Sequence, residues 1–192
     1  MRGDLERVLF DEPAIHRRLD DLAALISNDY RDRDLTVIAV LHGSLMFVAD
    51  LLRRIPLPLK LECLSVASYH GNTQSSGEVI FNPGTVSPSG DERILLPDVV
   101  GRDVLILDDI LDSGHTLTAV RETLETVRPR SIRMCVLLSK KKQRSREVFA
   151  DYVGFEIEDE FVVGYGLDFR GRYRNLSYVG VLRKELLEQP DK

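Results

Sequence analysis

The chain has 192 residues, which is enough for one domain with a complete hydrophobic core and short for two. Hydrophobic residues make up 43% of it and charged residues 30%, as is ordinary for a soluble globular protein. The net charge of −5 and the sequence pI of about 5.4 argue against a broad surface for nucleic acid or an anionic membrane. We therefore expect neither as a partner, whereas a small anion can still bind at a local site.

The cysteines and the N-terminal segment bear on the cellular compartment. Cys63 and Cys135 lie in apolar runs at no metal-ligand spacing and are predicted to be buried thiols. The N-terminal segment lacks an apolar stretch of signal-peptide length, and no apolar run approaches the roughly 18 residues of a membrane span. These features predict a cytoplasmic protein.

The first third of the chain alternates between helical and extended patterns. Apolar residues recur at helical spacing over residues 12 to 32. Residues 35 to 41 form an apolar run rich in β-branched side chains, which predicts a strand buried on both faces of a parallel sheet. A helix ended by Pro56 and a second strand over residues 59 to 68 follow.

Residues 69 to 101 are dense in Gly, Pro, Ser and Asn. A stretch of this length within a compact domain is usually a functional loop or a disordered one. Residues 77 to 81 are predicted to contribute to a two-stranded flap.

The rest of the chain contains a strand–loop–helix–strand unit. The strand VLIL begins at Asp103 and precedes an acidic loop, a helix over about 116 to 127 and a strand over 132 to 138. Such a unit implies a right-handed crossover and a parallel sheet. Short strands are expected at 152–155, 161–163 and 177–182. The predicted fold class is α/β, doubly wound, with a mostly parallel sheet flanked by helices.

The segment DDILDSGHT joins two kinds of chemistry at the carboxyl end of a strand, where parallel sheets bind ligands. Backbone N–H groups and hydroxyls at the start of a helix suit a phosphate. The carboxylates before them suit sugar hydroxyls, a hard divalent cation or proton transfer. The combination indicates a phosphorylated sugar with a metal, and the alternative is a helix-capping cluster. A P-loop is excluded, because its lysine is replaced by His115.

VLILDDILDSGHT resembles the signature of type I phosphoribosyltransferases, in particular their hypoxanthine-guanine branch. The resemblance runs from about residue 10 to residue 182. It implies one phosphoribosyltransferase domain over residues 1–192. In that domain, a flexible lid loop would span about 69–101, and a small purine-binding hood would combine residues 155–192 with the N-terminal segment. One departure is Asp108, where the branch usually has glutamate.

The resemblance assigns roles within the acidic segment. Asp112 would be the catalytic base or proton partner at purine N7. Asp108 and Asp109 would hold ribose hydroxyls and metal waters. The 5′-phosphate would be bound by Asp112, Ser113, Gly114, His115 and Thr116.

Two further segments resemble the pyrophosphate loop and the lid. His42, Gly43 and Ser44 would bind pyrophosphate, and the Leu41–His42 bond is expected to be a non-proline cis peptide. The alternative is an ordinary turn between strand and helix. His42 replaces the usual Lys or Arg. Ser68 and Tyr69 would begin the lid, which is longer than the family pattern over about 82–97.

The purine site is implied by two late segments. Lys140, at the end of LSK, would donate to the purine 6-oxo group, whereas Lys141, Lys142, Arg144 and Arg146 are interpreted as a solvated basic face. FVVGYGLDFRGRYRNL resembles the purine and metal segment. Phe161 would stack on the base, or else be a core aromatic residue. The backbone of Val162 would read the purine edge. Asp168 would hold Mg²⁺ beside the purine, and Arg174 would bind pyrophosphate.

The resemblance implies Mg²⁺-dependent transfer of the 5-phosphoribosyl group from phosphoribosyl pyrophosphate to N9 of a 6-oxopurine, hypoxanthine or guanine. This is a purine salvage reaction, and the family implies a homodimer or homotetramer. Two alternatives stay open. One is a regulator that retains the fold and binds nucleotide or RNA, and the other is a xanthine- or pyrimidine-specific enzyme.

Overall fold

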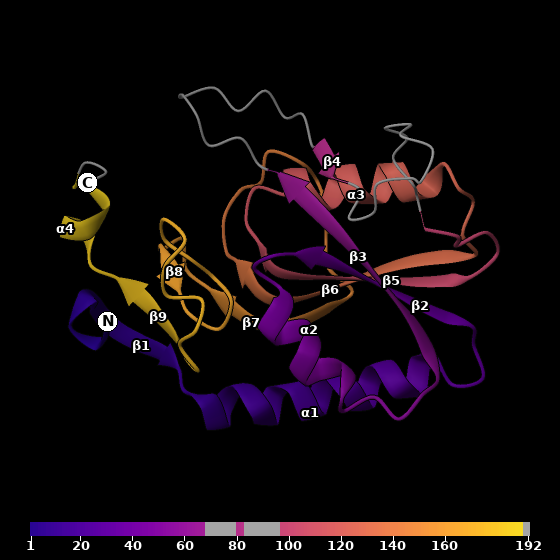
Figure 1. Ribbon diagram of the computed structural model, residues 1–192, viewed down its shortest axis with the longest axis horizontal. Helices are drawn as coiled ribbons and strands as arrows, with labels where there is room; N and C mark the ends of the chain where they lie inside the picture. The colour runs from indigo at the N-terminus through magenta and orange to yellow at the C-terminus, as the bar shows by residue number, and fades with distance from the viewer. Residues whose placement is uncertain (68–79, 83–96, 190–192) are drawn as a thin grey trace.

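The computed structural model describes residues 1–67, 80–82 and 97–189. Within these residues the strands form two sheets, one with the order β4-β3-β2-β5-β6-β7 and a smaller one with the order β1-β9-β8 (Figure 1). The strands are β1 (Leu5–Phe10), β2 (Leu35–Leu41), β3 (Leu59–Ala67), β4 (Ile80–Asn82), β5 (Asp103–Leu111), β6 (Ser131–Lys140), β7 (Tyr152–Ile157), β8 (Val162–Val163) and β9 (Val179–Leu182). The helices are the 3-10 turn η1 (Arg2–Asp4), α1 (Glu12–Asp29), α2 (Leu45–Leu52), α3 (His115–Glu125) and α4 (Lys184–Leu187).

The larger sheet is parallel from β3 to β7, and only the edge strand β4 runs antiparallel among its described strands. Helices cover both of its faces. Alternate residues of β2 and β5, such as Val37 and Leu105, pack with α1 and α2 on one side. Their neighbours, such as Ile38 and Val104, pack with α3 on the other (Figure 1). Strands buried on both faces explain the continuous apolar runs, and the predicted doubly wound fold is confirmed.

Local signals define the long helix α1. The Asp11 carboxylate accepts a hydrogen bond from the backbone N–H of Ala14 at 2.9 Å, which caps the first turn. Pro13 follows in that turn, where a missing N–H costs no helical hydrogen bond. The helix buries one stripe of apolar side chains against the sheet, namely Ile15, Leu19, Leu22, Ala23 and Ile26.

The smaller sheet joins the two ends of the chain. β1 pairs antiparallel with β9, and β9 pairs antiparallel with β8. Figure 1 shows these strands beside each other at the end of the molecule where both termini lie. The sequence does not predict β1, because this strand is mostly exposed and forms by pairing with a distant segment. It does not predict α4 either, which is four residues long and has no buried residue.

The structure departs from the sequence-based expectations at β5 and at Cys63. β5 extends to Leu111, so Asp108 and Asp109 belong to the strand rather than to a loop. Cys63 is exposed, and the prediction of a buried thiol is wrong there, whereas Cys135 is buried as predicted. Leu61 and Glu62, beside Cys63 in β3, are exposed as well. Among the described residues, no helix is long and apolar enough to cross a membrane.

The predicted lid lies almost entirely outside the described residues. This holds for Ser68, for Tyr69 and for most of the extension over 82–97. β4 overlaps the end of the predicted flap and pairs with β3 through Ala67 and Ile80.

Candidate active site

The carboxyl ends of β2, β5 and β6 bring the predicted motifs to one edge of the larger sheet. β2 ends at Leu41, β5 at Leu111 and β6 at Lys140. These strands are neighbours and run parallel, so the residues that follow them lie side by side. The loop after β8 reaches the same place, because Gly166 contacts Gly43.

The loop after β2 is built around a small residue. The Leu41–His42 peptide bond is cis, as expected. A β-carbon on Gly43 would stand 1.8 Å from Oδ2 of Asp109, so only glycine lets that carboxyl group lie against the loop. Ser44 is buried and donates its hydroxyl hydrogen bond to the carbonyl oxygen of Val40, while His42 is exposed.

Asp108, which is buried, and Asp109, which is half-buried, form an acidic pair next to this loop. The backbone N–H of Asp109 donates to Oδ1 of Asp108 at 3.0 Å. Burial raises the pKa of Asp108 well above its usual range, and the charge of Asp109 raises it further. Burial also raises the pKa of Asp109, although its hydrogen bonds and the charge of Arg174 oppose this. Such a pair favours a nearby cation or hydroxyl donor, which would offset the cost of burying negative charge.

The phosphate-binding candidate is the turn into α3. Gly114 is the N-cap with φ of +85°, a conformation that suits glycine. A β-carbon there would also stand 2.6 Å from Cγ1 of Val148. The first N–H groups of α3, from His115 onward, have no acceptor within the helix, so they are available to an anion.

Asp112 lies between two lysine side chains. Its Oδ2 is 2.9 Å from Nζ of Lys140, and its Oδ1 pairs with Nζ of Lys142. Asp159 contacts both ammonium groups, at 3.1 Å and 3.2 Å. Burial alone would raise the pKa of Asp112, but Lys142 and Lys140 together hold it below its usual range.

Two sequence interpretations change at this cluster. Lys142 is not part of a solvated basic face, because it pairs with Asp112. Asp159 was not singled out, although it belongs to the same cluster. Its sequence context, IEDEF, carries no motif, and only the fold brings this loop to the end of β6.

The segment after β8 packs against the loop after β2. Gly166 has φ of +102°, and a β-carbon on it would stand 2.0 Å from the carbonyl oxygen of Gly43. Arg174 donates to the Gly166 carbonyl oxygen at 2.7 Å and pairs with Oδ1 of Asp168 at 2.8 Å. The other Asp168 oxygen accepts from the backbone N–H of Gly171 at 2.8 Å. Arg174 is thus held near Gly43 and Asp109, and it holds Asp168 in turn.

Val162 is the first residue of β8 in the smaller sheet, and Phe161 immediately precedes it. The Phe161 side chain is 41% exposed, and its ring meets Phe169 edge-to-face at 5.5 Å between centroids. Val162 is buried and pairs with Val181 in β9. Phe161 is therefore not a core residue, and its ring is partly accessible to solvent.

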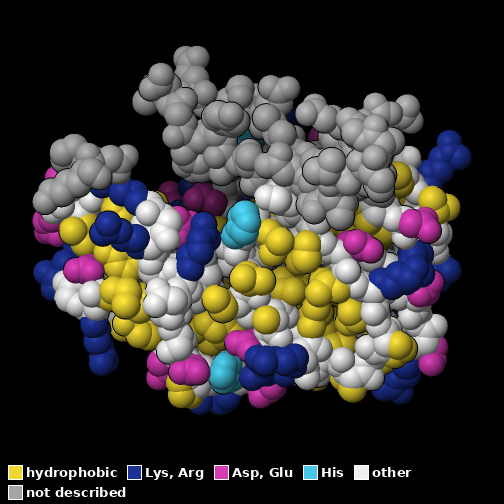
Figure 2. Space-filling view, viewed as in Figure 1, with side chains coloured by type: hydrophobic (Ala, Val, Ile, Leu, Met, Phe, Trp, Pro, Cys, Tyr) yellow, Lys and Arg dark blue, Asp and Glu magenta, His cyan; other side chains and the backbone are white. Residues whose placement is uncertain are grey.

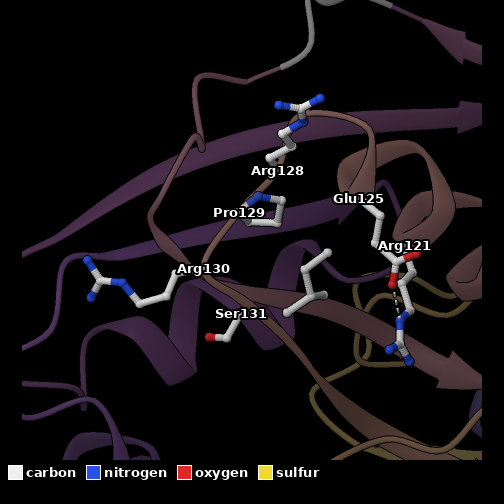
Figure 3. Close-up of a pocket in the computed structure, with 7 residues that line it drawn as sticks. Arg121, Glu125, Arg128, Pro129, Arg130 and Ser131 are labelled. Atoms are coloured by element: carbon white, nitrogen blue, oxygen red, sulfur yellow. Dashed lines mark hydrogen bonds and ion pairs between the residues drawn. The ribbon is translucent and has the colours of Figure 1, made fainter.

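A depression of about 220 Å³ at the opposite end of the larger sheet is a weaker candidate. It lies where α3 ends and β6 begins, and Figure 3 shows its residues. The side chains of Arg128 and Arg130 point away from each other (Figure 3). Arg121 pairs with Glu125 at 2.9 Å. No converging set of groups defines a ligand there within the part of the chain that is described.

The sequence matches a known family of proteins. The model of the phosphoribosyl transferase domain matches residues 8–170. The chain belongs to the phosphoribosyltransferase family. It is 41% identical over 186 residues to a hypoxanthine-guanine phosphoribosyltransferase of Staphylococcus epidermidis, covering 97% of this chain and 98% of that one. Identity to the enzyme of the same name from Mycobacterium avium is 43% over 196 residues, covering 97% and 90%.

Solved phosphoribosyltransferase structures share the fold. The crystal structure of a hypoxanthine phosphoribosyltransferase from Staphylococcus aureus superposes with a TM-score of 0.88 at 39% identity, covering 98% of this chain and 97% of that one. A hypoxanthine-guanine phosphoribosyltransferase from Bacillus anthracis gives a TM-score of 0.82 at 32% identity, covering 93% and 99%.

Proposed function

We propose that this protein transfers the 5-phosphoribosyl group from phosphoribosyl pyrophosphate to N9 of hypoxanthine or guanine, a purine salvage reaction. The observation that carries the proposal is the contact between Asp112 and Lys140 at the edge of the phosphate-binding turn. A proton acceptor and a donor for a 6-oxo group therefore stand one short contact apart, which matches N7 and O6 on one edge of an oxopurine. The identity to enzymes of this name supports the same assignment.

The reaction needs positioning and one proton transfer. The C1′–O bond to pyrophosphate breaks with its electron pair going to pyrophosphate, and N9 of the purine forms the new bond to C1′. The purine then loses its N7 proton, which Asp112 accepts as general base. The N–H groups and hydroxyls of Ser113, Gly114, His115 and Thr116 hold the 5′-phosphate, so the sugar is fixed while C1′ moves between partners.

The purine is held on three sides. Lys140 donates to O6, which distinguishes an oxopurine from an aminopurine. The exposed ring of Phe161 stacks on the base. The backbone of Val162 and the residue Asp168 complete the purine subsite.

The pyrophosphate subsite consists of the loop after β2 and one arginine. His42, Gly43 and Ser44 present backbone N–H groups, and Arg174 supplies a guanidinium that suits a diphosphate. The contact of Asp109 with Gly43 joins this subsite to the ribose subsite of Asp108 and Asp109.

Mg²⁺ is the proposed cofactor, and the donors present fit it. Asp108, Asp109 and Asp168 offer carboxylate oxygens, which are the ligands this cation prefers. Mg²⁺ usually takes one or two protein carboxylates and completes its shell with substrate phosphates and water. When bound, it would neutralise the negative charge that develops on the leaving pyrophosphate.

The domain organisation follows from the same proposal. Residues 1–192 form one domain, in which 69–101, preceded by Ser68, are the lid. The hood comprises residues from about 155 to 192 with the N-terminal segment. The pairing of β1 with β9 supports a hood built from both chain ends.

We also propose a homodimer or homotetramer. Figure 2 shows hydrophobic side chains gathered on the face that carries α2 and β3. Leu45 and Met46 of α2 and Leu61 of β3 are exposed. Exposed apolar patches of this kind often mark an interface with another protein chain. Sedimentation velocity at micromolar concentration tests this, with a monomer as the contrary result. The cytoplasm is the proposed location, since phosphoribosyl pyrophosphate is too highly charged to cross a membrane unaided.

A panel of bases separates this function from its rivals. The protein is mixed with phosphoribosyl pyrophosphate, Mg²⁺ and, in turn, hypoxanthine, guanine, xanthine, adenine and uracil. We expect nucleotide from hypoxanthine or guanine at least tenfold faster than from the other bases. Exclusive use of xanthine or uracil would move the assignment to those enzymes, and no product with any base would favour the regulator.

A further inference from the structure

The cluster of Asp112, Lys140, Lys142 and Asp159 contains more charge than the proposed reaction uses. The reaction as proposed uses one carboxylate and one ammonium, Asp112 and Lys140. Lys142 and Asp159 complete a set of two positive and two negative groups. These groups come from three separate segments, the end of β5, the end of β6 and the loop after β7.

The two lysines contact different oxygens of one carboxylate. Lys140 is 2.9 Å from Oδ2 of Asp112, whereas Lys142 pairs with Oδ1. When an oxopurine draws Lys140 to its O6, only Oδ2 is vacated. That oxygen is then free to accept the N7 proton, while the other oxygen keeps its partner.

We propose that Lys142 is a positioning residue that holds Asp112 by Oδ1, so that Oδ2 faces the purine proton when Lys140 moves to the 6-oxo group. This inference rests on the proposed function. Asp159 accepts from both ammonium groups, at 3.1 Å and 3.2 Å, and so keeps each lysine near Asp112 before and after the base binds. A carboxylate held at one oxygen loses less rotational freedom when it accepts the proton.

The charges around Asp112 support this role. Its described ionic contacts are Lys140 from the end of β6 and Lys142 two residues later, with Asp159 behind them both. The phosphate-binding turn adds His115, and the segment that packs on this turn adds Arg146. The Asp112 pairing raises the pKa of Lys142, so that Lys142 stays charged wherever Asp112 is ionised.

The neighbouring pair of Lys141 and Glu158 provides a matched control. It joins the same two segments at 3.4 Å, with both side chains more than half exposed, and neither has an ion pair with Asp112 among the described contacts. If these lysine ion pairs only held the two segments together, removing Lys141 or Lys142 would change the activity to a similar extent. Exposed pairs of this kind contribute about 0–1 kcal/mol.

The test compares Lys142→Gln, Lys142→Arg, Lys141→Gln and Asp159→Asn with the wild type. The kcat/KM for hypoxanthine is measured from about pH 5 to about pH 8, because this parameter reports ionisations of the free enzyme. We expect Lys142→Gln to lose about tenfold more activity at the acid end than at the alkaline end, since loss of a nearby cation makes Asp112 easier to protonate. Lys142→Arg restores the wild-type profile, and Lys141→Gln stays within about twofold of the wild type at each pH.

Asp159→Asn should not shift the acid limb of the kcat/KM profile to higher pH, in contrast to Lys142→Gln. Both lysines then have Asp112 as their remaining described partner in this cluster, so the acid limb stays in place or moves to lower pH. Equal acid losses in Lys142→Gln and Lys141→Gln would overturn the inference, as would an upward shift in Asp159→Asn that matches Lys142→Gln. Circular dichroism and thermal melting confirm that each variant is folded.

A substrate-free measurement separates this inference from the proposed function. The ¹³C carboxyl signal of Asp112, assigned by its loss in Asp112→Asn, is followed across pH in the wild type and in Lys142→Gln. The titration midpoint should rise in Lys142→Gln and stay unchanged in Lys141→Gln. An unchanged midpoint in Lys142→Gln refutes the inference even in an active enzyme. A wild type that forms no nucleotide refutes the function whatever the midpoints are.

Discussion

A β-carbon on Gly166 would stand 2.0 Å from the carbonyl oxygen of Gly43, so two loops of the site pack backbone against backbone. One of these loops is the proposed pyrophosphate subsite, and the other leads to Asp168. Arg174 stabilises the second loop, because it donates to the Gly166 carbonyl oxygen and pairs with Asp168. In the proposed function, this backbone contact would help to set the position of the diphosphate.

Substitution of Gly166 by alanine should disturb both loops. The new methyl group meets backbone rather than a flexible side chain, and φ is +102° there. We expect Gly166→Ala to lower the free energy of unfolding by about 2–5 kcal/mol, as overpacking and a positive φ together imply. Gly171→Ala is the control, because its φ is +73° but nothing lies within 4 Å of the added carbon. Urea denaturation should give a clearly smaller loss for Gly171→Ala, and equal losses would contradict the packing argument.

Gly43→Ala tests the contact with Asp109 in the same way. The added carbon would stand 1.8 Å from Oδ2 of Asp109, so the carboxyl group must move. We expect kcat/KM for phosphoribosyl pyrophosphate to fall by roughly 10²-fold, which is typical when a site group is displaced by about 1 Å. Steady-state kinetics checks this, and a variant that keeps wild-type kinetics would show that Asp109 does not position the ribose.

Asp112→Asn should preserve the fold and the binding of phosphoribosyl pyrophosphate while lowering turnover. An amide cannot accept the purine proton, and loss of a general base typically costs 10²- to 10⁴-fold. Calorimetry measures the binding, and initial rates with hypoxanthine measure the turnover. Unchanged kcat would remove Asp112 from the catalytic role.

Phe161→Ala should weaken purine binding with little effect on stability, because its side chain is 41% exposed. Stacking of a base on an aromatic ring is worth about 1–3 kcal/mol, so KM for hypoxanthine should rise by roughly 5- to 150-fold. Phe149→Ala is a suitable control, since Phe149 is 70% exposed and has no proposed contact with the base. Equal KM values in the two variants would argue against stacking.

Asp29 predicts a pH dependence of stability. Its carboxylate accepts hydrogen bonds from the Tyr152 hydroxyl at 2.7 Å and from Arg133 at 2.6 Å. The Tyr152 bond, then the Arg133 bond, lowers the pKa of Asp29 below the ordinary value of 3.8, although burial opposes this. A lowered folded-state pKa stabilises the protein above pH 3.8, and the stabilisation is lost as the pH falls through the folded value.

Thermal melting of Asp29→Asn across pH checks this sign. The Tm of the variant should be lower than that of the wild type near neutral pH, and the difference should shrink below about pH 4. A difference that grows on acidification would contradict the assignment.

The strands that carry the site could be predicted because their signals are local. Residues 35 to 41 were predicted as a buried strand, and β2 has these bounds. The turn from Ser113 to Thr116 could be placed at a helix start, because a strand and an amphipathic helix flank it. Lys140 follows a continuous apolar strand in the same way.

Features that depend on distant segments could not be predicted. β1 is mostly exposed and becomes a strand only through pairing with β9, at the other end of the chain. The ion pairs of Lys142 and Asp159 form because the ends of β6 and β7 are neighbours. In the sequence, Lys142 is one of several charged residues and could be interpreted only as solvated. Cys63 lies in an apolar run, but neither Cys63 nor its neighbours Leu61 and Glu62 are covered by other described segments, so the thiol is exposed.

In the proposed function, the edge of the sheet around Asp112 is where a phosphoribosyl group is transferred to an oxopurine. The most direct measurement quantifies inosine 5′-monophosphate and pyrophosphate together, after mixing the protein with phosphoribosyl pyrophosphate, Mg²⁺ and hypoxanthine. We expect equal molar amounts of the two products in the wild type, at a rate at least 10²-fold lower in Asp112→Asn. Pyrophosphate released without nucleotide, or neither product from a folded protein, would contradict it.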